Sequence, residues 1–95
     1  MEKVIRNKKY KVIKDFGETI NTLSLEEIVT DYYDNFDYIV GDWAYGKVRL
    51  KGFYNHKNKL AKSYNDYDNV DEYIANNCAY GCKHFILEKV IEKKE

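Results

Sequence analysis

The stretch Asp37–Tyr54 (DYIVGDWAYGKVRLKGFY) constrains the fold of this chain more than any other part of the sequence. Tyr38–Val40 is apolar at every position, which is typical of a strand that is buried on both faces. Lys47–Tyr54 alternates between apolar and polar residues instead, as expected of a strand with one packed and one open face. Only Ala44–Gly46 connects the two runs, and so short a connection requires an antiparallel pair. The sequence therefore predicts an antiparallel sheet that contains this hairpin.

The segment after residue 24 has the pattern of an amphipathic helix. Ser24 and Glu27 have the spacing of a capping box, in which each side chain bonds a free backbone N–H of the first turn. Apolar residues then recur at the i, i+3, i+4 and i+7 spacing from Leu25 onward. We therefore expect a helix over about residues 25–35, with its acidic side chains off the apolar stripe.

Shorter patterns predict the remaining elements. Alternating runs on both sides of the polar turn Asn7–Lys9 indicate an opening hairpin. Farther along, the expected elements are a turn at Asn55–Asn58, an edge strand at Lys59–Tyr64, a helix from Asp68 or Asn69 to about Asn77, and a last strand at Phe85–Ile91. The expected fold class is therefore α+β, an antiparallel sheet of about five to six strands with two helices in the order ββαβββαβ. A chain of 95 residues accommodates one such domain, residues 1–95.

The charged residues are segregated along the chain, although the net charge is zero. Residues 15–42 carry eight acidic and no basic side chains, and residues 43–64 carry six basic and no acidic ones. On the expected elements, this makes the helices acidic and the hairpins basic. If both helices cover one face of the sheet, we expect the other face to be largely basic.

The hydropathy of the chain bears on its location. No segment approaches the roughly 20 apolar residues that a membrane-spanning helix needs. The first residues, MEKVIRNKKY, lack the uninterrupted apolar core of a secretory signal. We therefore expect a cytoplasmic protein with reduced thiols and no membrane association.

Two segments of the chain match the motifs of a known family. The segment DYIVGDWAYGKVRLKGF follows the pattern D-Y-I-V-G-D-W-x-Y-x-x-L-R-L-K-G-F, with Val48 in place of the usual leucine. The later segment CAYGCKHFIL follows C-x-x-G-C-x-x-F-x-L, with matches at Cys78, Gly81, Cys82, Phe85 and Leu87. The chain therefore resembles the YutD-like proteins, small uncharacterised proteins of Gram-positive bacteria and their relatives. The resemblance implies no activity, because none is established for the family.

Basic side chains on the expected hairpins are the first candidate for a binding site. Alternation along one strand places Lys47, Arg49, Lys51 and Phe53 on the same face. Lys9 and Lys11 of the opening hairpin could extend this basic surface. The cations could hold phosphates while the aromatic ring stacks on a base, which is the chemistry of RNA or single-strand binding. The alternative is that these are solvated outer residues, with lysines that guard a sheet edge.

The two cysteines are the second candidate. Cys78 and Cys82, together with His84 and His56, have the residue types of a zinc site. The alternative is a pair of small buried cysteines near the end of a helix, which we favour. We therefore expect no metal and no cofactor.

Asp42 is the third candidate, because it stands at a strand end beside Trp43 and Tyr45. Burial there could raise its pKa toward the range of a general acid. A general acid needs a partner, however, and no paired carboxylate stands at a suggestive spacing. A turn bond from the Asp42 carboxylate to local backbone explains the residue more simply. Because no phosphate-binding, nucleophile or metalloprotease motif is present, we favour a protein that is not an enzyme.

The aromatic residues are the last candidate. Five of them sit at spacings typical of a core: Tyr32, Tyr33, Phe36, Tyr38 and Trp43. Tyrosines that reach the surface would instead form a patch for a partner. The sequence therefore favours a binding or regulatory module that uses a basic sheet face for RNA or another polyanion. The alternative is a protein-interaction domain that docks through its acidic helices or exposed tyrosines.

Overall fold

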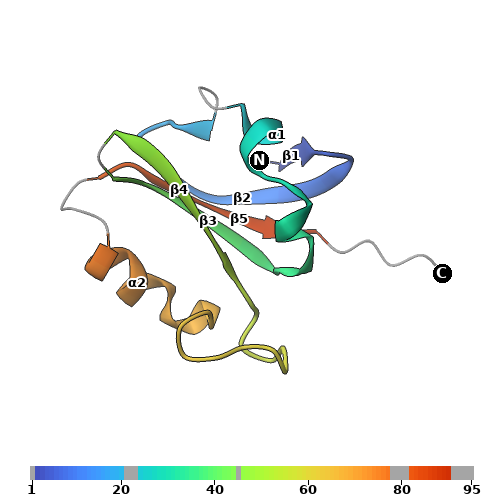
Figure 1. Ribbon diagram of the computed structural model, residues 1–95, viewed down its shortest axis with the longest axis vertical. Helices are drawn as coiled ribbons and strands as arrows, with labels where there is room; N and C mark the ends of the chain where they lie inside the picture. The colour runs from blue at the N-terminus through green and yellow to red at the C-terminus, as the bar shows by residue number, and fades with distance from the viewer. Residues whose placement is uncertain (1, 21–23, 45, 78–81, 91–95) are drawn as a thin grey trace.

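The computed structural model describes residues 2–20, 24–44, 46–77 and 82–90. These residues form a five-stranded antiparallel sheet with helices on both sides (Figure 1). The strands are β1 (Glu2–Ile5), β2 (Lys8–Phe16), β3 (Tyr38–Ala44), β4 (Lys47–Phe53) and β5 (His84–Lys89). The helices are α1 (Leu25–Ile28) and α2 (Val70–Asn77), and the 3₁₀ helices are η2 (Asp31–Asn35) and η3 (Tyr67–Asn69). The α+β class with an antiparallel sheet and two helices is confirmed.

The strands lie in the order β1-β2-β5-β3-β4, so β1 and β4 are the two edges of the sheet. Both predicted hairpins are present, with Ile5 opposite Lys8 in the first and Ala44 opposite Lys47 in the second. The first turn consists of Arg6 and Asn7, which both have positive φ. It therefore begins one residue earlier than the polar run suggested, because this pair adopts the left-handed conformation that a two-residue hairpin needs.

The two helices pack on opposite faces of the sheet (Figure 1). Successive residues of β5 point to opposite faces: Phe85 joins the cluster around α1, and Ile86 joins the cluster around α2. Val70 anchors α2 on its face, and Leu25 anchors α1 on the other. The expectation of one largely basic open face is therefore wrong, because α2 covers part of it.

The helix expected over residues 25–35 is interrupted. Val29 and Thr30 adopt extended backbone conformations between α1 and η2. Both residues are β-branched and lower helix propensity, and Glu27 and Asp31 would repel one another in a continuous helix. The Val29 carbonyl instead accepts a hydrogen bond from Arg6 Nε at 3.0 Å. Ser24 makes no side-chain capping bond within the described residues, so the capping-box prediction is wrong.

The segment between β4 and η3 is a loop of turns, and the edge strand expected at Lys59–Tyr64 is absent from it. Asparagine side chains hold these turns in place of strand pairing. Asn55 Oδ1 accepts from the Lys57 backbone at 3.0 Å, and Asn58 Oδ1 accepts from the Leu60 backbone at 2.9 Å. Such bonds mimic a backbone turn and compete with extended structure.

The second helix and the last strand are confirmed as α2 and β5. Asp66 caps the helical segment, because its side chain accepts a hydrogen bond from the Asp68 backbone. Within the described residues, no helix combines the length and the apolar character that a membrane crossing requires.

Candidate functional site

Asp42 and Arg49 form an ion pair across the β3–β4 hairpin. The two residues are directly opposite in the strand register. Arg49 Nε and Nη2 donate to the two carboxylate oxygens of Asp42 at 3.2 and 3.0 Å. Arg49 Nη2 also donates to the Asn77 carbonyl at 2.9 Å, at the end of α2. The Asp42 side chain is 1% exposed, so Arg49 supplies the charge that this buried carboxylate needs.

The cations of β4 lie on the face that α2 covers. Lys51 Nζ lies 5.4–5.6 Å from the ring centroids of Phe53, Tyr64 and Tyr73. Phe53 is 1% exposed and packs against Tyr73, so its ring is not available to stack on a base. The strand therefore brings the predicted residues Arg49, Lys51 and Phe53 together on one face. These residues contact α2 there and do not form an open surface.

The lysines of the first hairpin lie elsewhere. Lys9 and Lys11 belong to β2, which is separated from β4 by β5 and β3. Lys9 Nζ is 3.9 Å from a carboxylate oxygen of Glu2 on the neighbouring strand. The two groups of cations therefore do not form one continuous patch along adjacent strands.

The structure does not gather the residues named for zinc. Cys78 lies outside the described residues, and Cys82 is disulfide-bonded, so the expectation of a reduced thiol is wrong for Cys82. His84 is buried, with Nδ1 at 3.1 Å from the Cys82 carbonyl oxygen and its ring stacked on Phe16. Among the described residues, His56 joins neither His84 nor Cys82 in a cluster of metal-binding side chains.

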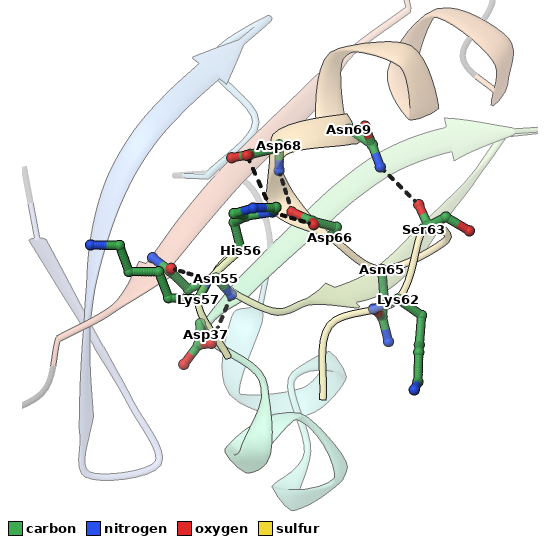
Figure 2. Close-up of polar contacts among 10 residues, drawn as sticks. All are labelled: Asp37, Asn55, His56, Lys57, Lys62, Ser63, Asn65, Asp66, Asp68 and Asn69. Carbon is green, nitrogen blue, oxygen red and sulfur yellow. Dashed lines mark hydrogen bonds and ion pairs between the residues drawn. The ribbon is translucent and has the colours of Figure 1, made fainter. Parts of the chain in front are cut away.

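His56 instead pairs with two carboxylates of the η3 segment (Figure 2). His56 Nδ1 lies 2.7 Å from Asp66 Oδ2 and 3.4 Å from Asp68 Oδ2. The hydrogen bond to Asp66, and the negative charges of both aspartates, raise the pKa of His56. The ligand atoms of the three residues lie within 4.8 Å of one another, so a cation could replace the proton. A protonated His56 offsets one of the two negative charges of this cluster.

Further hydrogen bonds fix the loop after β4 to the rest of the domain (Figure 2). Asp37 Oδ2 accepts from the Asn55 backbone at 2.8 Å and from Asn58 Nδ2 at 3.1 Å. Farther along, Asn69 Nδ2 donates to the Ser63 carbonyl at 3.1 Å. These bonds tie one end of the loop to Asp37, directly before β3, and the other end to η3.

Two hollows lie on either side of β4, and they meet at Lys51 and Tyr64. The first, which we call the tyrosine hollow, measures about 190 Å³, and its lining includes Tyr32, Tyr33, Phe36, Leu50, Lys51 and Tyr64. The second, which we call the α2 hollow, measures about 500 Å³, and its lining includes Lys51, Ser63, Tyr64, Asn69, Glu72 and Tyr73. Hollows with aromatic walls and a few polar groups are typical of binding surfaces.

Tyr32 and Tyr64 are the functional candidates that the sequence interpretation missed. Tyr32 is 68% exposed and Tyr64 is 67% exposed. The core assignment is therefore wrong for Tyr32, whereas it is confirmed for the buried Tyr38. Helical spacing from Leu25 suggested burial of Tyr32, but the structure breaks that spacing at Val29 and Thr30, before Tyr32. Of the other named residues, Trp43 is partly buried against Phe85, and Tyr45 lies outside the described residues.

The fold and this site define a small α+β protein with an aromatic surface on each side of an edge strand. The family model described as "Putative antitoxin YutD-like" matches residues 4–88, so the chain belongs to the YutD-like family. It is 34% identical over 87 residues to "Putative antitoxin YutD" of Bacillus subtilis (strain 168), a match that covers 92% of this chain and 96% of that protein. The solution NMR structure of yutD from the same species is similar, with a TM-score of 0.78 and 32% identity, covering all of this chain and 86% of that one.

Proposed function

We propose that this protein is a non-enzymatic binding module that docks a partner protein on the tyrosine hollow. The exposure of Tyr32 and Tyr64 carries the proposal. Tyrosine is enriched at protein interfaces because its ring offers apolar area while its hydroxyl offers a hydrogen bond. Leu60, which is also exposed, belongs to the same loop as Tyr64.

Nucleic acid remains the second candidate, because residues 46–64 carry six basic and no acidic side chains. The contacts of the described residues favour nucleic-acid binding less than they favour a partner protein. Arg49 is engaged with Asp42 and with the end of α2, and Phe53 is buried. The family description, "Putative antitoxin YutD-like", suits a protein that acts by binding another molecule, and therefore supports a binding partner without specifying its class.

A capture experiment with matched variants tests the proposal. The tagged full chain is incubated with nuclease-treated lysate of Bacillus subtilis, the organism of the similar protein. We expect one stoichiometric protein to be retained by wild type and lost with Tyr32→Ala/Tyr64→Ala. The control is Val4→Ala/Ile13→Ala, which truncates two exposed apolar side chains on β1 and β2. Equal capture by both double variants, or capture of a protein from untreated lysate but of none from nuclease-treated lysate, would contradict the proposal.

A further inference from the structure

The outer edge of β4 carries backbone groups that point away from the sheet. Tyr54 marks the direction of these groups: its N–H donates to the Asn65 carbonyl, and its carbonyl accepts from the Tyr67 N–H, both on the side away from β3. Backbone groups alternate in direction along a strand. The N–H and C=O groups of Val48, Leu50 and Gly52 therefore face outward, and no strand of the described residues pairs with them.

The two hollows lie above and below this same edge. Leu50 and Gly52 line the tyrosine hollow, and Phe53 lines the α2 hollow. Lys51 and Tyr64 belong to both. Because side chains of a strand point alternately to the two faces, a strand added at this edge would send alternate side chains into the two hollows.

We propose that the outer edge of β4 receives an extended, acidic segment of a partner protein as a sixth strand. The inference rests on the proposed function and names the binding mode and the chemistry of the partner. A row of alternating donors and acceptors matches another peptide backbone. Phosphate groups offer acceptors only, so a phosphate backbone could pair with the outward N–H groups of Val48, Leu50 and Gly52 but not with their carbonyls.

Charge selects the kind of segment. Residues 46–64, which form β4 and the loop beside it, contain six basic and no acidic side chains. A second copy of the chain docked edge to edge would bring these cations together, so self-association through β4 is unfavourable. A segment with Asp or Glu at alternate positions complements the positive charges of Lys47 and Lys51. Glu72, the acidic residue in the lining of the α2 hollow, opposes part of this attraction.

The length of the segment follows from the ends of the edge. Pairing of Tyr54 with the 65–67 segment closes one end, and the turn before Lys47 closes the other. The available edge from Val48 to Gly52 spans roughly 17 Å, which accommodates about five residues. The added strand is therefore short, and apolar contacts in the two hollows must contribute to its affinity.

Amide chemical shifts of the full chain test the inference directly. The probes are an eight-residue peptide of alternating glutamate and valine, the same peptide with lysine for glutamate, and the acidic peptide with N-methyl groups at alternate amides. We expect the acidic peptide to shift the amides of Val48, Leu50 and Gly52. We expect the lysine and N-methylated peptides to bind at least ~10-fold more weakly.

A pair of variants isolates the backbone contribution. Val48→Pro removes an outward N–H without removing a bond to β3, and proline is tolerated on edge strands. Val48→Ala removes the side chain and keeps the N–H. Binding of the acidic peptide is expected to fall at least ~10-fold in the proline variant and to stay within ~3-fold in the alanine variant. If Val48→Pro unfolds, the N-methylated peptide supplies the same comparison on the wild-type protein.

Three results would overturn strand addition. They are an absence of shifts at ~1 mM acidic peptide, equal binding of the N-methylated peptide, and larger shifts with a single-stranded RNA octamer than with the acidic peptide. The capture experiment separates the two proposals. If Tyr32→Ala/Tyr64→Ala loses the partner while Val48→Pro retains it, the protein-binding function stands and strand addition fails.

Discussion

The ring of Phe36 lies directly over Gly52. A Cβ atom built on Gly52 would be 2.2 Å from the nearest ring carbon, a distance at which the ring or the strand must move. The glycine therefore permits the segment after η2 to pack flat against β4, beside the tyrosine hollow. Gly41 and Phe85 repeat the arrangement, also at 2.2 Å.

Replacement of Gly52 tests this close packing. We expect Gly52→Ala to lower the free energy of unfolding by about 2 kcal/mol, as overpacking does elsewhere. Chemical denaturation measures the change. In a Phe36→Ala background, the same substitution should cost much less, because the ring that it meets is gone. An equal cost in both backgrounds would mean that the ring is not what excludes a side chain at this position.

The Asp42–Arg49 pair makes a second prediction. Arg49→Ala leaves the buried Asp42 carboxylate without its cation and should destabilise the fold by about 3 kcal/mol. Lys47→Ala, two residues away on the same exposed edge, should change stability by less than about 0.5 kcal/mol. Thermal or denaturant unfolding compares the two. Similar stabilities for both variants would show that Asp42 does not depend on Arg49.

The pKa of His56 makes a third prediction. It is raised above the ordinary value of 6.5 by the hydrogen bond to Asp66 and by the charges of Asp66 and Asp68. Because the folded pKa exceeds the unfolded one, protonated His56 contributes its full stabilisation below the unfolded pKa, and this contribution is lost as pH rises through the folded pKa.

Titration of the His56 ring by NMR measures this shift. Asp66→Asn should move the pKa of His56 back toward 6.5. Asp68→Asn should have the smaller effect, because Asp68 lies farther from the ring and contributes only through its charge. An unshifted pKa in the wild-type protein would mean that His56 does not form this pair in solution.

Hydrogen exchange along β4 makes a fourth prediction. The amides of Arg49 and Lys51 face β3, whereas those of Val48 and Leu50 face away from the sheet. We expect the outward amides to exchange at least ~10-fold faster than the inward ones. Mass spectrometry or NMR resolves the alternation. Uniform protection along the strand would mean that its outer edge is already occupied in the free protein.

The strands were predictable because their signal is local. Alternation in Lys47–Tyr54 and the short connection before it define the β3–β4 hairpin without reference to any distant residue. The interrupted helix was not predictable from spacing. Its break depends on Val29, which is buried, and whose carbonyl is bonded by Arg6 from a turn 23 residues earlier in the chain.

The candidate site was only partly predictable for the same reason. The sequence indicated Lys47, Arg49, Lys51 and Phe53 as one face of a strand, which the structure bears out for the last three. It gave no signal for the exposure of Tyr64, because the loop that presents it is held by bonds to Asp37 and η3. Such contacts join residues far apart in sequence and leave no periodic pattern.

The sequence by itself determined the antiparallel hairpin Asp37–Tyr54, the α+β class and the family, because alternation, turn length and motif spacing are local properties. Only the tertiary structure decided what covers each face of that hairpin. Strand alternation separates two faces but does not say on which side a helix returns. α2 packs on the cationic face, so Arg49 neutralises a buried carboxylate, and the outer edge of β4 lies between two hollows with aromatic walls.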